Sequence, residues 1–313
     1  MQPKIKVIGV GGSGSNTISR MASLRNQAKL DANTVELIAV NTDAQALHFC
    51  KADKKILIGK DITHGLGTGM DANLGKESAE ESKQEISENL EGADMVFVTC
   101  GLGGGTGSGA SPTIAEISKG LGILTVVVVT TPFSFEGAER KKVAELAIKN
   151  LKEKADSLLA ISNDKLLKII DEKTTVSNAF SICDDVLGQA VQGITDLILV
   201  PGIINIDFAS VLSIMKNSGR AMFGTGKASG ENRAILAAEQ AINSPLLDFS
   251  IQGSKGVLFN AAGQDVTLSE IQEAAKVITK NVDQRAQIIF GAVKDNTLKK
   301  GEIKITVIAT KLV

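Results

Sequence analysis

The stretch GLGGGTGSG, residues 101–109, decides the fold class of this chain. It follows a continuous apolar run, Met95 to Thr99, and leads into a helical pattern from Pro112 to Leu121. Such a run is typical of a strand buried on both faces. Six glycines in these nine residues are costly in backbone entropy, so a purely structural loop rarely contains so many. The unit therefore predicts a phosphate site, in which backbone N–H groups wrap the anion and Thr106 and Ser108 add hydroxyl groups.

A second glycine loop, GVGGSGSN at residues 9–16, follows the first predicted strand, 5–10. Its Gly9, Gly11 and Gly14 also satisfy the GxGxxG pattern of dinucleotide-binding proteins. A second interpretation, a tight turn that binds no ligand, also remains open. The lysine of a P-loop is missing from both stretches. We therefore expect phosphate charge to meet backbone dipoles, a metal ion and Arg140. A third loop, Gly65 to Met70, is equally compatible with closing over a terminal phosphate and with a surface turn.

Short β-rich runs alternate with helical ones in the first half of the chain, which predicts a doubly wound, mostly parallel α/β sheet. The apolar spacing from Phe180 to Ile198 predicts one long connecting helix. A smaller α+β domain follows it. We thus expect a nucleotide-binding domain at 1–178, a central helix at 179–200 and a C-terminal domain at 201–313. The predicted strands are 5–10, 35–40, 95–99, 124–130, 157–161, 256–261, 287–293 and 302–310, and the predicted helices include 78–90, 112–121, 207–215, 231–243 and 267–282.

Composition excludes several function classes. The 313 residues carry a net charge of -1 and contain no Trp and no Tyr, so neither charge nor stacking surfaces favour nucleic acid. The cysteines Cys50, Cys100 and Cys183 lie far apart, which predicts no disulfide framework, no zinc site and a reducing cytoplasm. The chain contains only two histidines, so catalysis by histidine is not expected. No apolar run approaches the roughly 20 residues of a membrane span, so we expect no direct membrane insertion.

Residues 103–109, GGGTGSG, resemble the signature of the tubulin superfamily, and motifs along almost the whole chain are similar to the tubulin/FtsZ family. These motifs are IKVIGVGG, VNTDAQAL, GLGTG, EGADMVFVTCGLGGGTGSGA, GILTVVVVT, PFSFEG, NDKLL, VQGITDLI and NIDFA. The resemblance implies a GTP-binding domain, a central helix and a GTPase-activation domain. It also implies GTP and GDP as nucleotides, Mg²⁺ bound mainly through their phosphates, and head-to-tail polymerisation of the chain into protofilaments of the cell-division ring in the cytoplasm.

The resemblance also implies a set of nucleotide-binding residues. Glu136 and Arg140 match positions that hold the ribose and the neighbouring phosphate, although an exposed ion pair explains their spacing equally well. Phe180 and Asp184 match the positions that face the base; without the resemblance they read as a core residue and a solvated acid. The full set is Gly11, Gly12, Ser13, Gly14, Ser15, Asn16, Gly103, Gly104, Gly105, Thr106, Gly107, Glu136, Arg140, Asn163, Phe180 and Asp184.

Catalysis in the family is split between subunits, and the loop after the central helix brings acidic residues to the γ-phosphate of the next subunit. Here that loop contains Asn205, Asp207 and Ser210. Asp207 matches the first acidic position and is equally suited to cap the following helix. Ser210 departs from the family, which has a second aspartate there. A hydroxyl group supplies no negative field, so we expect slow hydrolysis, with a slowly or non-hydrolysing filament scaffold as the alternative.

The remaining expectations concern partner proteins and an alternative function as an oxidoreductase. The resemblance implies cell-division regulators and membrane tethers as partners, the latter recruited through a C-terminal tail. No such tail follows Val313, and the sequence leaves open whether it has been truncated or whether this is a natural short form that depends on another protein to reach the membrane. An NAD-dependent oxidoreductase is supported only by Gly9 to Gly14 and lacks a proton-transfer histidine.

Overall fold

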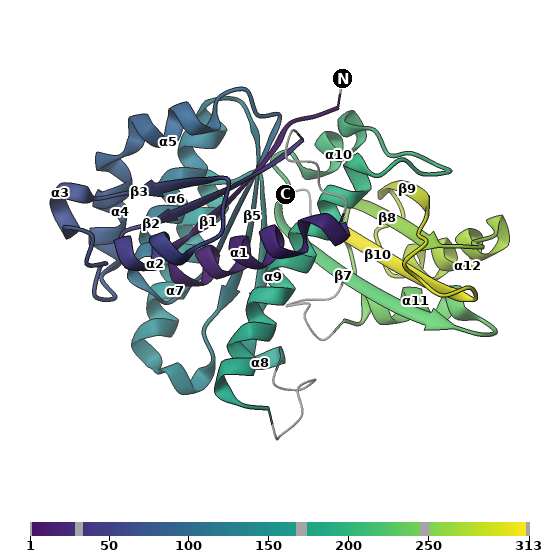
Figure 1. Ribbon diagram of the computed structural model, residues 1–313. Coiled ribbons are helices and arrows are strands. Elements are labelled where there is room, and N and C mark those ends of the chain that lie inside the picture. The colour runs from purple at the N-terminus through teal and green to yellow at the C-terminus, as the bar shows by residue number, and fades with distance from the viewer. Residues whose placement is uncertain (1, 29–33, 167–173, 245–250, 311–313) are drawn as a thin grey trace. The chain divides into compact units, whose positions relative to one another are not determined.

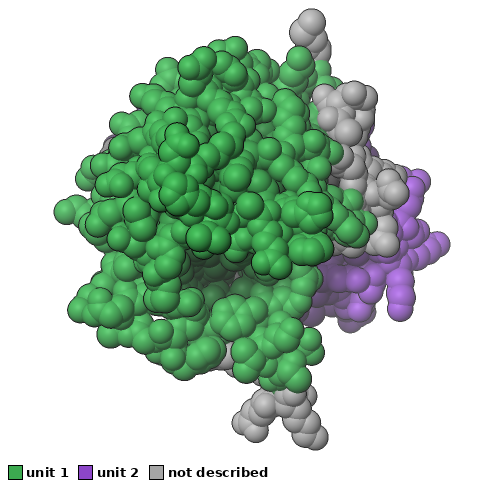
Figure 2. Space-filling view, turned by 60° about the vertical axis from the view of Figure 1, so that its left-hand side comes forward, with its two compact units in different colours: residues 1–192 green, residues 193–313 purple. Residues whose placement is uncertain are grey.

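The computed structural model describes residues 2–28, 34–166, 174–244 and 251–310 (Figure 1). The chain divides into two compact units, Met1–Gln192 and Gly193–Val313, which Figure 2 shows in separate colours. Leu167, the last residue of the NDKLL motif, lies outside the described residues.

The first unit is built on a parallel sheet with the strand order β3-β2-β1-β4-β5-β6. All five predicted strands of this half are present, which confirms the doubly wound α/β fold class. β3 was not predicted, because it is short and begins with two exposed lysines. The strands are β1 (Ile5–Val10), β2 (Val35–Asn41), β3 (Lys54–Leu57), β4 (Met95–Gly101), β5 (Leu124–Thr131) and β6 (Ser157–Ser162). The order reverses between β1 and β4, and ligands bind at such a switch point, outside the carboxyl ends of the strands.

Helices cover both faces of this sheet. On β4, Val96, Val98 and Cys100 pack in one core cluster with Ile114 of α6. The alternate residue Phe97 points to the other face and is also fully buried. The helices are α1 (Gly11–Ala28), α2 (Ala44–Phe49), α3 (Lys60–Thr63), α4 (Ala72–Glu81), α5 (Lys83–Leu90), α6 (Gly105–Gly120), the 3₁₀ turn η1 (Ser134–Glu136), α7 (Ala138–Lys154), α8 (Asn163–Leu166) and α9 (Val176–Leu199), whose residues from Gly193 on belong to the second unit.

Two helix predictions were wrong in their bounds. The predicted helix 78–90 is two helices, α4 and α5, separated at Ser82. The predicted start of α6 at Pro112 is seven residues too late, because the glycine stretch itself forms the first turns. A Cβ on Gly109 would lie 2.0 Å from the carbonyl oxygen of Ala72. The small residues that suggested a loop therefore serve the close packing of α4 on α6.

The second unit has a mixed sheet with the order β7-β10-β8-β9, in which only β8 and β9 pair in parallel. Apolar faces of α11 and α12 pack on it. The predicted strands and the capping box of Thr267 with Glu270 are confirmed. The elements are α10 (Phe208–Met215), β7 (Gly219–Ser229), α11 (Arg233–Ile242), β8 (Gly256–Gly263), α12 (Leu268–Thr279), β9 (Gln287–Lys294) and β10 (Glu302–Thr310).

Strand β7 was missed because its glycines resemble turn residues. A Cβ on Gly224 would lie 2.0 Å from the carbonyl oxygen of Ala241, and one on Gly226 would lie 2.1 Å from that of Ala237. Both oxygens belong to α11. The glycines therefore let a helix lie directly on the strand.

An ion-pair network centred on the buried Arg233 ties α11 to the start of α12. The Arg233 guanidinium donates to Asp265 at 2.8 Å and to both oxygens of Glu270, and only 9% of its side chain is exposed. Hydrogen bonding to Arg233 lowers the pKa of the Glu270 carboxyl below its usual value. Glu270 in turn accepts from the N–H of Thr267 at 2.8 Å.

Replacing Arg233 by methionine is expected to lower the free energy of unfolding of this unit by about 2 kcal/mol, because it leaves two carboxylates without their partner. A carboxyl group with a lowered folded-state pKa stabilises above its unfolded pKa and loses this contribution as pH falls through the folded one. Thermal unfolding should therefore show a gap in Tm between native and Arg233→Met chains that narrows as the pH falls from neutral through 4.5, the ordinary pKa of a glutamate, into the acid range. A constant gap over this range would contradict the assignment.

Candidate functional site

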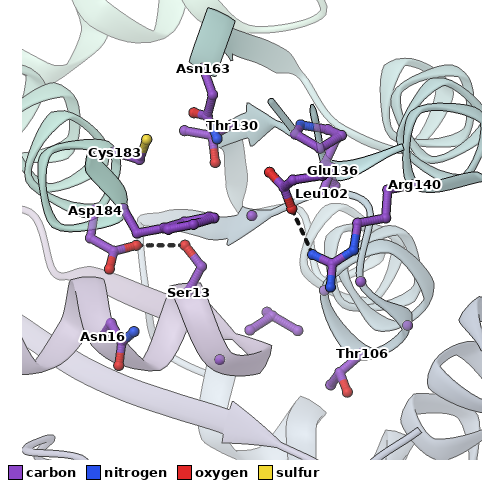
Figure 3. Close-up of a pocket in the computed structure, with 18 of the residues that line it drawn as sticks. Ser13, Asn16, Leu102, Thr106, Thr130, Glu136, Arg140, Asn163, Cys183 and Asp184 are labelled. Atoms are coloured by element: carbon purple, nitrogen blue, oxygen red, sulfur yellow. Dashed lines mark hydrogen bonds and ion pairs between the residues drawn. The ribbon is translucent and has the colours of Figure 1, made fainter. Parts of the chain in front are cut away.

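A cavity of about 400 Å³ lies at the carboxyl ends of β1, β4 and β5, beside the N-termini of α1 and α6 (Figure 3). This is the switch point of the sheet. Most of the predicted nucleotide-binding residues line it. They are Gly12, Ser13, Asn16, Gly104, Gly105, Thr106, Gly107, Glu136, Arg140, Asn163, Phe180 and Asp184.

One side of the cavity is suited to an anion. Gly104 is the N-cap of α6, and the N–H groups of Gly105, Thr106 and Gly107 belong to its first turn. Such N–H groups have no partner within the helix, and the helix dipole favours negative charge at this end. A Cβ on Gly12 or on Gly104 would meet no atom within 4 Å, so the backbone is open to a ligand there. These features fit a polyphosphate.

The other predicted residues of the two loops lie next to the cavity without lining it. A Cβ on Gly14 would lie 2.7 Å from the carbonyl oxygen of Thr99, so this residue lets α1 approach β4. Gly11 and Gly103 have φ values of 70° and 99°, in the left-handed region that favours glycine. Ser15 is buried and contacts Asn41 through its hydroxyl group. Gly11, Gly14, Ser15 and Gly103 thus shape the loops and do not line the cavity.

Three threonines connect α6 with the loop at residues 65–70. The Thr106 hydroxyl lies 2.7 Å from that of Thr42 and 3.4 Å from that of Thr68. Thr68 lines the cavity, whereas Leu66 and Met70 on the same loop are 85% and 50% exposed. Between the two interpretations left open for this loop, the position of Thr68 favours contact with a ligand.

Glu136 and Arg140 form an ion pair in the cavity wall. Arg140 donates to the carboxylate at 2.7 Å, and Glu136 also accepts from the N–H of Phe133 at 2.8 Å. Only 10% of the Glu136 side chain is exposed, against 38% for Arg140. The i,i+4 spacing therefore does indicate an ion pair, and this pair faces the cavity. The Arg140 guanidinium has further N–H donors with which it can bind an anion.

The other end of the cavity combines an aromatic face with a buried acid. Phe180 is 39% exposed and contacts Phe133 edge to face, with ring centroids 5.4 Å apart. Asp184 is 7% exposed and accepts a hydrogen bond from the Ser13 hydroxyl at 2.7 Å (Figure 3). The interpretation of Asp184 as a solvated acid was wrong, because α1 covers it.

Several effects act on the pKa of Asp184. Burial has the largest effect and raises the pKa of its carboxyl, while the Ser13 hydrogen bond and the Arg20 charge lower it. Burial likewise raises the pKa of the neighbouring Cys183 thiol to about 12, so this thiol is neutral. Across the cavity, the side-chain oxygen of Asn163 is buried and has no hydrogen-bond partner. Such an orphaned acceptor points to a ligand that carries hydrogen-bond donors.

Asn205, Asp207 and Ser210 lie in the second unit, on the segment before α10 and in its first turn. The segment is fixed to β9, because the N–H groups of residues 203 and 204 donate to the carbonyl oxygen of Ala292 at 2.7 and 3.1 Å. Its side chains alternate: Ile206 is buried, while Asn205 and Asp207 are exposed.

Asp207 caps α10. Its carboxylate accepts from the N–H of Ser210 at 2.7 Å, which is the capping role that the sequence left open. Hydrogen bonds from Ser210 lower the pKa of the Asp207 carboxyl, so it is ionised at neutral pH. Asn205 accepts from the N–H of Gly202 at 2.6 Å.

Sequence reasoning missed some residues that line the cavity. They are Thr130, Pro132 and Cys183, whereas Val10, Thr68, Gly101 and Leu102 lie within the three predicted glycine loops. Thr130 ends a predicted parallel strand, so its position at the switch point was a usable signal. No sequence signal marks Cys183 as a cavity residue, since its exposure to the cavity depends on how α9 is rotated about its axis.

Within the described ranges, no cluster of three or more His, Cys, Asp or Glu side chains is arranged to hold a metal ion. A search of the helices in the same residues found none with the length and apolarity of a membrane span.

Comparisons with known proteins agree with this geometry. Residues 4–171 match the family model "Tubulin/FtsZ family, GTPase domain", and residues 219–313 match "FtsZ family, C-terminal domain". The chain is 50% identical over 310 residues to cell division protein FtsZ 1 of Pyrococcus horikoshii, covering 99% of this chain and 81% of that one. It is 49% identical to the protein of the same name from Thermococcus kodakarensis, again covering 99% and 81% of the two chains.

Solved structures give the same result. An empty FtsZ dimer of M. jannaschii aligns with a TM-score of 0.91 at 44% identity, over 99% of this chain and 88% of that one. The GxGxxG pattern at residues 9–14 lies inside the matched GTPase domain, so the oxidoreductase interpretation was wrong. The chain belongs to the tubulin/FtsZ family, with the family's GTPase domain followed by an FtsZ C-terminal domain.

Proposed function

We propose that this chain is a cell-division GTPase that binds GTP in the cavity of its first unit and assembles head to tail into protofilaments. The single observation that carries the proposal is the pairing within one cavity of an anion-binding helix N-terminus with an aromatic ring and a buried acid. The relatives' name, cell division protein FtsZ 1, supports a role at the division site in the cytoplasm. The M. jannaschii FtsZ dimer supports self-association.

The nucleotide is oriented by the two ends of the cavity. The N–H groups of α6 and α1, with Arg140, bind the phosphates, and Mg²⁺ is held mainly through phosphate oxygens. The base lies against Phe180, and the Asp184 carboxylate accepts from its N1–H and its exocyclic amino group. Adenine offers neither donor in this arrangement, so Asp184 selects guanine.

Hydrolysis requires a group from a second molecule. The carboxylates that line the cavity already have partners, Arg140 for Glu136 and Ser13 for Asp184. The segment fixed to β9 presents Asn205 and Asp207 to solvent, where a neighbouring subunit's nucleotide can meet them. Because the pKa of Asp207 is lowered, it acts by orienting and polarising the attacking water and is a weak proton acceptor.

Ser210 makes this chain a slow GTPase. It stands in the first turn of α10, beside Asp207, and offers only a hydroxyl group where the family has a second aspartate. Filaments of the native chain should therefore persist after assembly. The alternative, a scaffold that does not hydrolyse GTP at all, differs only in its steady-state rate of phosphate release.

The test measures assembly and phosphate release together over a range of protein concentrations. Light scattering should rise with GTP and Mg²⁺ but not with GDP, and phosphate release per subunit should appear only above the concentration at which filaments form. A release rate per subunit that is independent of concentration would contradict a site shared between molecules. Phosphate release indistinguishable from the blank in visible filaments would favour the non-hydrolysing scaffold.

Replacing Asp184 by asparagine is expected to weaken GDP binding by about 10-fold to 10²-fold, because a charge-assisted acceptor is lost. The amide instead offers a donor to the second carbonyl group of xanthine, so the affinity for XDP should rise. Isothermal calorimetry with GDP and XDP measures both changes. Equal affinities of the native and variant chains for GDP would show that Asp184 does not contact the base.

A further inference from the structure

Arg20 lies outside the nucleotide cavity but is bonded to the turn of α9 that carries Asp184. One guanidinium nitrogen, Nη1, donates to the Asp185 carboxylate at 2.6 Å, and Nη2 donates to the Ser181 hydroxyl. None of these three residues lines the cavity. Ser181 and Asp185 are one helical turn apart and stand on either side of Asp184 in the sequence.

This contact is part of a polar strip between α1 and α9. Ser13, Asn16 and Arg20 are spaced three and four residues apart, so they share one face of α1. The first and last of them bond to the turn of α9 from Ser181 to Asp185: Ser13 donates to Asp184, and Arg20 donates to Ser181 and Asp185. The strip therefore fixes both the rotation of α9 about its axis and its distance from α1.

Asp184 depends on such fixation. It is buried and adjacent to a second carboxylate, and both conditions disfavour its charged form. The Arg20 guanidinium compensates the charge of Asp185 and also lowers the pKa of Asp184. To accept two hydrogen bonds from one base edge, the carboxylate must be ionised and its plane must be held.

We propose that Arg20 is a positioning residue for guanine recognition: by holding Ser181 and Asp185 against α1, it fixes the Asp184 carboxylate toward the cavity. This inference rests on the proposed function, in which Asp184 reads the base. Arg20 does not touch the nucleotide and acts only through α9. Its guanidinium suits the task because the planar fork bonds a hydroxyl group and a carboxylate at the same time.

The experiment compares GDP with IDP by isothermal calorimetry. IDP lacks only the exocyclic amino group, so the ratio of the two dissociation constants isolates that one contact of the base. For the native chain we expect a preference for GDP of about tenfold or more, as for a hydrogen bond to a charged group. Arg20→Met should lower this ratio about three- to tenfold. Arg20→Lys should recover part of it, since a point charge remains but the fork is lost.

Lys142→Met is the matched control. It removes one positive charge from an exposed ion pair with Glu139 on α7, and it should leave the ratio unchanged. An Arg20→Met chain that binds GDP and IDP more weakly by the same factor would overturn the proposal, because loose packing of α9 affects both ligands equally. If this variant does not fold, Ser181→Ala serves instead: a ratio reduced about twofold supports the proposal, and an unchanged ratio contradicts it. A native chain that binds neither nucleotide refutes the proposed function itself.

Discussion

The Ser210→Asp chain is expected to hydrolyse GTP about 10²-fold faster per subunit than the native chain once filaments have formed. Phosphoryl transfer to water is accelerated mainly by positioning and by charge, and the new carboxylate supplies both beside Asp207. The variant should also fold. Position 210 lies in the first turn of α10, where the helix dipole favours an acid. Steady-state phosphate release, measured above the assembly threshold, gives the rate.

Ser213→Asp provides the control for added charge. Ser213 lies one turn further along α10, is exposed, and donates its hydroxyl to the carbonyl oxygen of Ser210. A carboxylate there changes the net charge by the same amount without reaching the position of the first turn. It should leave the rate close to the native value. Faster filament disassembly should accompany Ser210→Asp alone, and a native rate in that variant would refute the role assigned to Ser210.

Replacing Gly105 by alanine is expected to lower the affinity for GTP and GDP by about 10²-fold, as for the loss of two hydrogen bonds to a charged group. A Cβ at this position would lie 2.6 Å from the carbonyl oxygen of Asp71 and 2.8 Å from its nitrogen. Both are backbone atoms, so the start of α6 must move away from the loop at residues 65–71. The N–H groups of its first turn then no longer converge on the phosphates. Calorimetry with GDP measures the loss.

Gly120→Ala separates this effect from a general effect of glycine replacement in α6. Gly120 is the last residue of the same helix, and a Cβ on it would meet no atom within 4 Å. Alanine there should bind GDP like the native chain and stabilise it by about 0.5–1 kcal/mol. If Gly105→Ala also bound GDP with native affinity, the N-terminus of α6 would not be the phosphate site.

The fold of the first unit could be predicted from sequence because its strands are continuous apolar runs. Residues 95–99 and 124–130 show no alternation, and in the structure both faces of these strands are buried. The glycine-rich elements could not be predicted in the same way. In α6 and β7 the glycines face the backbone of α4 and α11, and a contact with a distant helix leaves no local pattern.

One end of the candidate site could be predicted from residue types, and the other end could not. Glycines after two neighbouring strands indicated an anion site, and the structure brings Gly12 and Gly104 to one cavity. The base-facing end could not be recognised from residue types. Phe180 and Asp184 have ordinary helical spacing, and only the packing of α1 on α9 buries the acid and turns it toward the cavity.

The sequence by itself determined the family, the doubly wound sheet and the two glycine loops, because these are carried by local runs and ordered motifs. Tertiary structure alone decided which glycines face the cavity and which face a helix, and how Asp184 is held. The Ser13–Asp184 contact joins residues 171 positions apart, and Arg20 reaches Asp185 across 165 positions. Side chains so distant in sequence are brought together only when the sheet has placed α1 against α9, so no local pattern in the chain contains this information.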